Sequence, residues 1–188
     1  MTAVIRNEIT PLPGFRSPEA AVFLAQLDDQ LRLVREATRD LSPEDLAWQP
    51  APGQNTIGML LTHMAIAEVG WAKVILGGEA PGADVDDVLG IHQEDDGMPI
   101  AEGAPAYGPL SGKTIGFYDD LLERSREHLK RLARERPPED MDREIRRERP
   151  DGSVRVLNVR WFYYHILEHF SGHYGQILLL KHLRRAAG

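Results

Sequence analysis

Residues 160–176 read RWFYYHILEHFSGHYGQ, and the fold prediction starts from this stretch. It predicts part of a long helix, in which a four-residue step turns only about 40° around the axis, so His165, His169 and His173 share one face. Histidines four residues apart lie about 6 Å apart along the axis, close enough for both rings to bind one ion. His165 and His173 lie about 12 Å apart, so one of these two must have another role.

His63 is the second candidate ligand. It stands in LLTHMA, residues 60–65, within the most apolar helical segment of the chain. A lone histidine there is more often a core residue with hydrogen-bonded ring nitrogens. Beside a second apolar helix with three stacked histidines, however, four buried imidazoles would leave many polar nitrogens without partners. A shared metal ion removes that difficulty, so the residues favour a metal site.

Four long helical segments predict an all-α fold, a four-helix bundle. Each segment is preceded by a residue that can cap a helix: Ser17 before 18–41, Asn55 before 57–77, Ser111 before a helix that ends before Pro137, and Asn158 before a helix that ends near Arg185.

Two connections are expected to be irregular. Residues 79–109 are rich in glycine, proline and acids, which predicts a long crossover loop with one short helix near 85–89. Residues 145–149 and 154–157 flank Pro150-Asp151-Gly152, which predicts a small hairpin or extended segment before the last helix. The acidic residues of the loop, Asp95 and Asp96 among them, and the mixed charges of 123–155 are interpreted as solvated.

The composition limits the classes of function. A chain of 188 residues, 42% hydrophobic and 27% charged, predicts one globular domain over 1–188. It has no cysteine, which excludes thiolate ligands and disulfides. Residues 1–15 lack the features of a signal peptide and no segment has about 20 uninterrupted apolar residues, so we expect a cytoplasmic protein. A net charge of −7 argues against nucleic acid or an anionic membrane as partner.

Two familiar metal motifs are absent from the sequence. No Glu-x-x-His occurs, which excludes the carboxylate-bridged di-iron bundle, and no His-Glu-x-x-His occurs, which excludes the usual zinc peptidase helix. A mononuclear site remains, with two histidines from one helix and one from another.

These stretches together resemble the DinB/YfiT-like family of metal-dependent enzymes. The similarity lies in LAWQPAPG at 46–53, TIGMLLTHM at 56–64 and HILEHFSGHYGQI at 165–177, and it extends over about 18–183. The resemblance implies a four-helix bundle connected up-down-down-up. It also implies a divalent metal, Zn, Ni, Mn or Fe, held by His63, His169 and His173.

The resemblance also implies a set of activities. Characterised members of the family include transferases that use low-molecular-weight thiols of the bacillithiol or mycothiol type, which is our first hypothesis, with His165 and Glu168 as catalytic residues beside the metal. The alternatives are a metal-dependent hydrolase and a non-catalytic, stress-associated metal-binding bundle. In the first two cases the partner is a small-molecule substrate, and we expect a homodimer.

Overall fold

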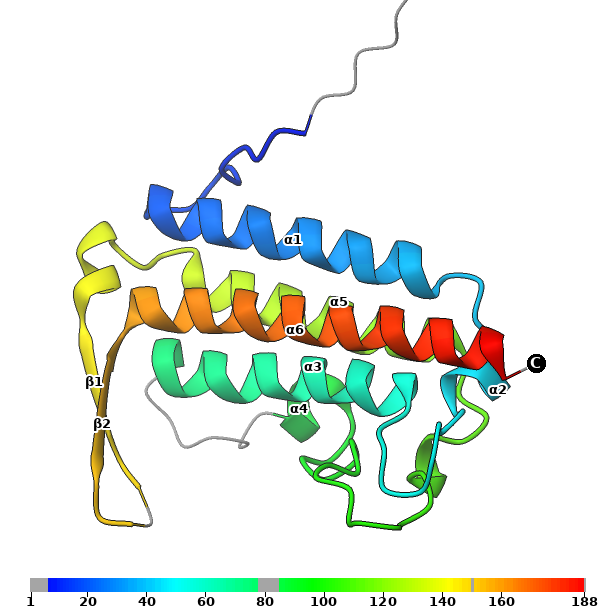
Figure 1. Cartoon of the computed structure of the whole chain (residues 1–188). Helices are drawn as coiled ribbons and strands as arrows, with labels where there is room; N and C mark the ends of the chain where they lie inside the picture. The colour runs from blue at the N-terminus through cyan, green and yellow to red at the C-terminus, as the bar shows by residue number, and fades with distance from the viewer. Residues whose placement is uncertain (1–6, 78–84, 150, 188) are drawn as a thin grey trace, which may run out of the picture.

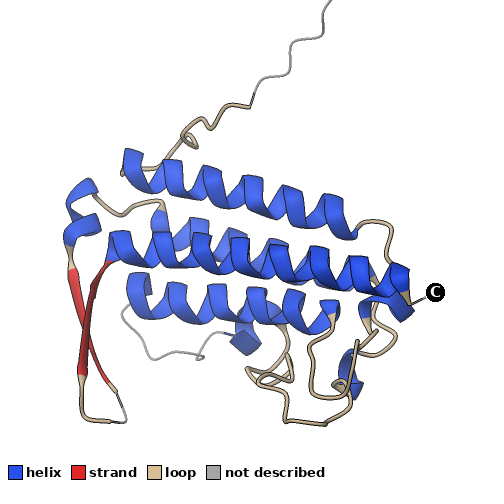
Figure 2. Ribbon diagram, viewed as in Figure 1, coloured by secondary structure: helices blue, strands red, loops and turns tan. Residues whose placement is uncertain are grey.

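The structure is a computed structural model that describes residues 7–77, 85–149 and 151–187. The chain is mostly helical, as the sequence predicts, with one small two-stranded sheet (Figures 1 and 2). The four long helices are α1 (Pro18–Thr38), α3 (Ile57–Ala72), α5 (Ile115–Ala133) and α6 (Val159–Ala186). The shorter elements are α2 (Pro43–Leu46), a π-helical turn (Lys73–Gly77), α4 (Val85–Leu89), two 3₁₀ turns (Gly108–Leu110 and Pro138–Asp142), β1 (Glu144–Glu148) and β2 (Val154–Asn158).

Local hydrogen bonds explain where two of the long helices begin. The Ala20 N–H donates to the Ser17 hydroxyl at 3.2 Å, and the Trp161 N–H donates to the Asn158 side chain at 2.8 Å. Each cap satisfies one backbone N–H group that the helix itself leaves unpaired. The predicted starts of α1 and α6 are therefore confirmed.

The predicted cap of α3 is wrong by one residue, and that of α5 is wrong by three residues. The hydroxyl of Thr56, and not Asn55, accepts from the Met59 N–H at 3.1 Å, so the next polar residue along the chain is the cap of α3. Ser111 closes a 3₁₀ turn by donating its N–H to the Gly108 carbonyl at 2.9 Å. Helix α5 therefore begins only after Thr114.

The apolar faces of the long helices meet in one core. Helix α3 packs against α5 and α6, and α1 packs against the same two helices. Fully buried residues come from all four: Leu24 and Leu27, Leu60 and Leu61, Leu121 and Leu122, Phe162 and Phe170. Within the described residues one stretch, Ile57–Leu76, has the length and hydropathy of a membrane span. Most of it is buried by the other helices, as in the core helix of a soluble protein.

Strands β1 and β2 form an antiparallel hairpin that stands at one end of the helices, before α6 (Figure 1). The predicted hairpin is thus confirmed, with bounds that differ by one residue. In its register Ile145 lies opposite Leu157, and Arg147 lies opposite Arg155. Because strand side chains alternate between faces, these four residues share one face of the hairpin.

One charged residue of α5 contradicts the predicted solvated face. Arg126 is only 1% exposed, and its Nε donates to Glu68 Oε1 at 2.7 Å, where Glu68 is 0% exposed. Its Nη1 also donates to Asp28 on α1 at 3.1 Å. The cause is the packing of α5 against α3 and α1, which brings two acids of other helices to the guanidinium. Arg126, on α5, is therefore hydrogen-bonded to acids of two other long helices, α3 and α1.

Candidate metal centre

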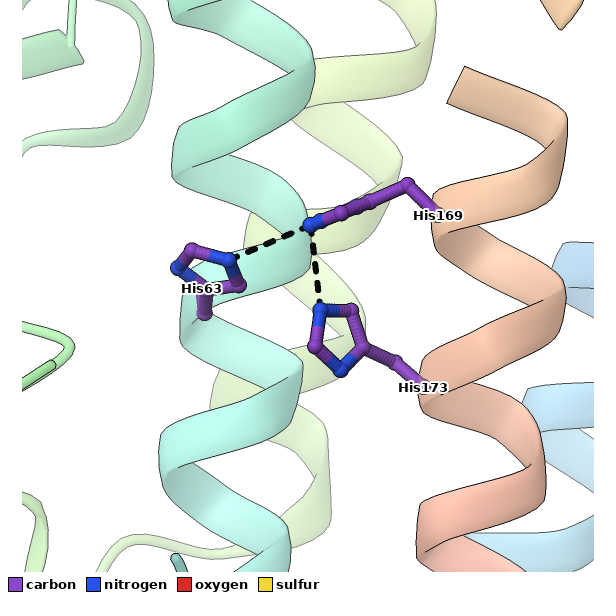
Figure 3. A group of neighbouring side chains, drawn as sticks. All are labelled: His63, His169 and His173. Carbon is purple, nitrogen blue, oxygen red and sulfur yellow. Dashed lines mark hydrogen bonds between the residues drawn. The ribbon is translucent and has the colours of Figure 1, made fainter. Parts of the chain in front are cut away.

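Three histidines from two helices point toward one another (Figure 3). The His169 Nε2 atom lies 3.1 Å from His63 Nε2 and 3.0 Å from His173 Nε2. One ligand atom from each ring lies within 4.8 Å of the others. His63 comes from α3, while His169 and His173 stand one turn apart on α6.

Hydrogen bonds at the outer nitrogens orient two of these rings. His63 Nδ1 donates to Asp96 Oδ2 at 2.8 Å, and His173 Nδ1 donates to Gln176 Oε1 at 2.8 Å. A neutral imidazole whose Nδ1 carries the proton has a lone pair on Nε2. The Nε2 atoms of His63 and His173 therefore both turn lone pairs toward His169.

His169 is the central ring and the most desolvated of the three. Burial, together with the neighbouring His173, His63 and His165, lowers its pKa from 6.5 to about 3. Burial also lowers the pKa of His173. His169 Nδ1 is buried and has no hydrogen-bond partner among the described residues. His169 and His173 are therefore neutral near pH 7, and the Nε2 atom of His169 faces those of His63 and His173.

The distances from His169 Nε2 to the other two Nε2 atoms fit a shared metal ion. Nitrogens about 2.0–2.1 Å from one zinc ion lie about 3.3 Å apart at tetrahedral angles and about 2.9 Å apart at right angles. The observed separations of 3.1 Å and 3.0 Å fall between these values. The Nε2 lone pairs of His63 and His173 face His169 Nε2, and a cation among the three nitrogens could accept a lone pair from each ring. The three histidines could therefore hold a metal ion.

The two predicted catalytic residues lie beside this group and outside it. The ring of His165 stacks on Trp161 at 4.6 Å between centroids and lies 6.3 Å from the His169 ring. Its Nδ1 donates to Glu168 Oε2 at 3.4 Å. The Glu168 side chain is 58% exposed and also accepts from the Tyr164 hydroxyl at 3.3 Å. Of the three histidines on this face of α6, His169 and His173 join His63 in the group, and His165 does not.

Asp96 is the residue of the site that sequence reasoning missed. The solvated position expected for it is wrong, because it is only 4% exposed and its Oδ1 accepts from the Met98 N–H at 3.0 Å. The turn that directs it inward uses Gly97, whose φ is +67° and whose added Cβ would lie 2.5 Å from Tyr107 Cβ. No spacing connects positions 63 and 96, so the only local signal is an acid followed by a turn glycine.

A cleft of about 550 Å³ opens beside His63. Apolar residues of α3 and the following loop form much of its wall, and polar groups stand at intervals between them. Its lining consists of Ile66, Ala67, Gly70, Trp71, Met98, His63, Asp96, Gln93, Glu94 and Arg147. A few polar groups in a largely apolar cleft of this size are typical of small-molecule sites.

Replacing Asp96 with alanine is expected to lower the affinity for metal by about 10- to 100-fold. The carboxylate fixes the tautomer and orientation of His63, and without it the Nδ1–H of a partly buried ring loses its acceptor. The affinity can be measured by competition with a chromophoric chelator on the purified protein.

Asp95 offers a matched control for Asp96. It is the preceding acid and its carboxylate accepts from the His92 N–H at 2.8 Å, away from His63. Asp95→Ala removes the same charge from the same loop, so it should leave the affinity within about twofold of wild type. Equal losses in the two variants would show that general electrostatics, and not orientation of His63, controls binding.

One comparison with known protein families gives a match. The family description "DinB superfamily" matches residues 26–177, a range that contains all three histidines, Asp96 and most of the four long helices. No curated protein matches the chain. Because the match covers most of the sequence, the chain belongs to the DinB superfamily.

Proposed function

We propose that the chain is a mononuclear metal-dependent enzyme that transfers a low-molecular-weight thiol to an electrophilic small molecule. The observation that carries this proposal is the convergence of three histidine ring nitrogens beside a cleft of about 550 Å³. A site that serves only structure is closed by four protein ligands, whereas three ligands leave a position for a reacting molecule. His63, His169 and His173 are the proposed ligands.

A divalent metal bound there would supply Lewis acidity, which lowers the pKa of a thiol or a water. The protein's own groups supply the rest. Asp96 fixes His63, and apolar side chains of α3 provide surface for the carbon skeleton of a substrate. His165, held at Nδ1 by Glu168, is the proposed base that accepts the thiol proton.

The proposed reaction conserves atoms and electrons. The thiol proton passes to His165, the sulfur electron pair forms a bond to the electrophilic carbon, and the bond from that carbon to its leaving group breaks. The leaving group departs with that electron pair and takes up a proton. The chain contains no cysteine, so the thiol must come from outside the protein.

The finer topology is also an inference of ours. In Figure 1, α1 and α6 run in one direction while α3 and α5 run in the other. Two neighbouring helices that run the same way need a long connection, and the segment between α3 and α5 covers residues 73–114. We therefore infer a single four-helix bundle domain connected up-down-down-up.

Turnover of a thiol and an electrophile tests the function. The protein, loaded in turn with Zn²⁺, Ni²⁺, Mn²⁺ and Fe²⁺, is mixed with bacillithiol or mycothiol and with monochlorobimane, and the fluorescent conjugate is measured. We expect metal-dependent conjugation that falls at least about 100-fold in His165→Ala, the usual contribution of a general base. The metal content of that variant should stay unchanged.

Three other results would contradict the proposal. Metal-dependent cleavage of an ester or amide panel without any thiol would identify a hydrolase instead. Full metal occupancy with no turnover of either panel would identify a non-catalytic metal-binding protein. Unchanged conjugation in His165→Ala would remove this residue from the mechanism.

A further inference from the structure

Two arginines face the same side of the hairpin without an acid between them. Arg147 on β1 and Arg155 on β2 are direct partners in the antiparallel register, and both side chains are half-buried. Like charges directly opposite each other destabilise an antiparallel pair. The repulsion between the two guanidinium groups must therefore be offset by other contacts.

Indole rings hold both guanidinium groups in place. The Arg147 guanidinium lies 5.0 Å from the centroid of the Trp71 ring, and that of Arg155 lies 4.3 Å from the centroid of Trp161. The two indoles contact each other, with centroids 6.4 Å apart. Stacking on an aromatic ring fixes the position of a cation but leaves its charge and its N–H donors available.

Neither arginine is paired with an acid in the part of the chain that the structure describes, since no carboxylate there lies within ion-pair distance of them. Other arginines near the hairpin are paired: Arg143 Nε lies 2.5 Å from Asp140 Oδ1, and Arg160 Nε lies 2.5 Å from Glu19 Oε1. Arg143 and Arg160, at the base of the hairpin, are thus neutralised by acids. Arg147 and Arg155, on its inner face, have no acidic partner among the described residues.

Of these two residues, Arg147 lines the cleft beside the candidate metal centre. It lines the same cleft as His63, and the Trp71 beneath it stands two turns after His63 on α3, about 12 Å along the axis. The cleft also contains two acids. Asp96 is already bonded to His63 and the Met98 N–H, whereas Glu94 is exposed. A doubly charged phosphate would be repelled by Glu94 more strongly than a singly charged carboxylate.

We propose that Arg147 binds a carboxylate of the small molecule that reacts at the three histidines. The planar guanidinium presents parallel N–H donors that match the two oxygens of a carboxylate. The Trp71 ring packs against the guanidinium and keeps it oriented. This assignment rests on the proposed function, in which a thiol reacts with an electrophile. It states that one of these two molecules is a carboxylic acid.

The zinc-loaded protein is titrated with octanoate and with octanol, and then with mercaptooctanoate and mercaptooctanol. Binding is followed by tryptophan fluorescence, because Trp71 lies against Arg147. We expect the acid of each pair to bind about tenfold more tightly than the alcohol, as for one charge-assisted hydrogen-bonded pair at a half-buried site. Equal binding of acid and alcohol would overturn the proposal.

Arg146 provides the matched control, because it is exposed, precedes Arg147 on the same strand and faces the other side of the hairpin. Arg147→Gln should abolish the preference for the acid, whereas Arg146→Gln, which removes the same charge, should keep it. Equal losses of preference in both variants would overturn the site. Tighter binding of octyl phosphate than of octanoate would overturn the choice of a carboxylate.

The binding experiment separates this proposal from the proposed function. If no thiol is turned over but Arg147→Gln still abolishes the preference for octanoate over octanol, the transferase function is wrong and the carboxylate site stands. If thiols are turned over and octanoate binds no better than octanol, the carboxylate site is wrong and the transferase function stands.

Discussion

Replacing His169 with alanine is expected to empty the metal site. Its Nε2 is the atom that lies close to both other ligands, at 3.1 Å and 3.0 Å, so two remaining rings cannot surround an ion. Structural zinc sites bind with about 10–16 kcal/mol over four ligands, or about 3 kcal/mol for each, so the affinity should fall more than about 100-fold. Metal content after dialysis, measured by plasma mass spectrometry, gives the result directly.

The unfolding temperature provides a second readout of the same variant. Metal present at 100 times its dissociation constant stabilises the folded wild-type protein by about 2.7 kcal/mol. His169→Ala should lose this shift. The metal-free variant should fold about as well as metal-free wild type, because the mutation removes a desolvated ring whose Nδ1 has no partner among the described residues.

His165→Ala is the control on the same helix, one turn earlier. Its ring stacks on Trp161 and lies outside the three-histidine group, so the variant should keep its metal. An empty site in His165→Ala together with a full site in His169→Ala would contradict the ligand assignment. An unchanged metal content in both variants, and in His63→Ala, would show that the histidines bind no metal.

Features set by neighbouring residues could be predicted from the sequence. The caps at Ser17 and Asn158 depend on hydrogen bonds to backbone groups three residues away, and the hairpin depends on the turn at 150–152 and its flanking strands. The shared face of the α6 histidines follows from helical geometry alone. Where two polar residues compete, as Asn55 and Thr56 do, the local pattern gives the helix but not its first residue.

Features set by contacts between distant residues could not be predicted in this way. Helical spacing showed that His165 and His173 could not both share an ion with His169. The choice between them depends on the position of α3, which brings His63 to His169 and His173. Asp96 reaches His63 across 33 positions of sequence, and Arg126 reaches Glu68 across 58. In composition, both charged residues belong to stretches that are typical of solvated surface.

The second large effect is expected at the buried ion pair between Glu68 and Arg126. Glu68→Ala leaves a guanidinium that is 1% exposed with only Asp28, whose side chain is 31% exposed, as its remaining acid. Removing one partner of a buried pair costs about 3–5 kcal/mol of folding free energy. For a chain of this length, that corresponds to a fall in Tm of about 10 °C, measured by circular dichroism on the metal-free protein.

A surface pair and a double variant separate the possible causes of this loss. Glu123→Ala removes a carboxylate that is 50% exposed and lies 2.5 Å from Arg35, so it should cost less than about 1 kcal/mol. Glu68→Met combined with Arg126→Met replaces the buried pair by apolar groups of similar length, so its stability should return to within about 1 kcal/mol of wild type. A double variant as unstable as Glu68→Ala would show that the ion pair itself, and not the unpaired charge, decides the stability.

The Arg126 guanidinium of this ion pair also contacts both helices that carry the candidate ligands, α3 through Glu68 and α6 through Phe170. Glu68 follows His63 on α3, and the Arg126 guanidinium lies 5.1 Å from the ring of Phe170, the residue after His169 on α6. An unpaired Arg126 would move toward solvent and leave Phe170 without this contact, so α3 and α6 would lose a common support. We therefore expect Glu68→Ala to weaken metal binding although it changes no ligand, and Glu123→Ala to leave it unchanged. Unaltered affinity in Glu68→Ala, measured below its Tm, would show that the three histidines are held by the apolar core alone.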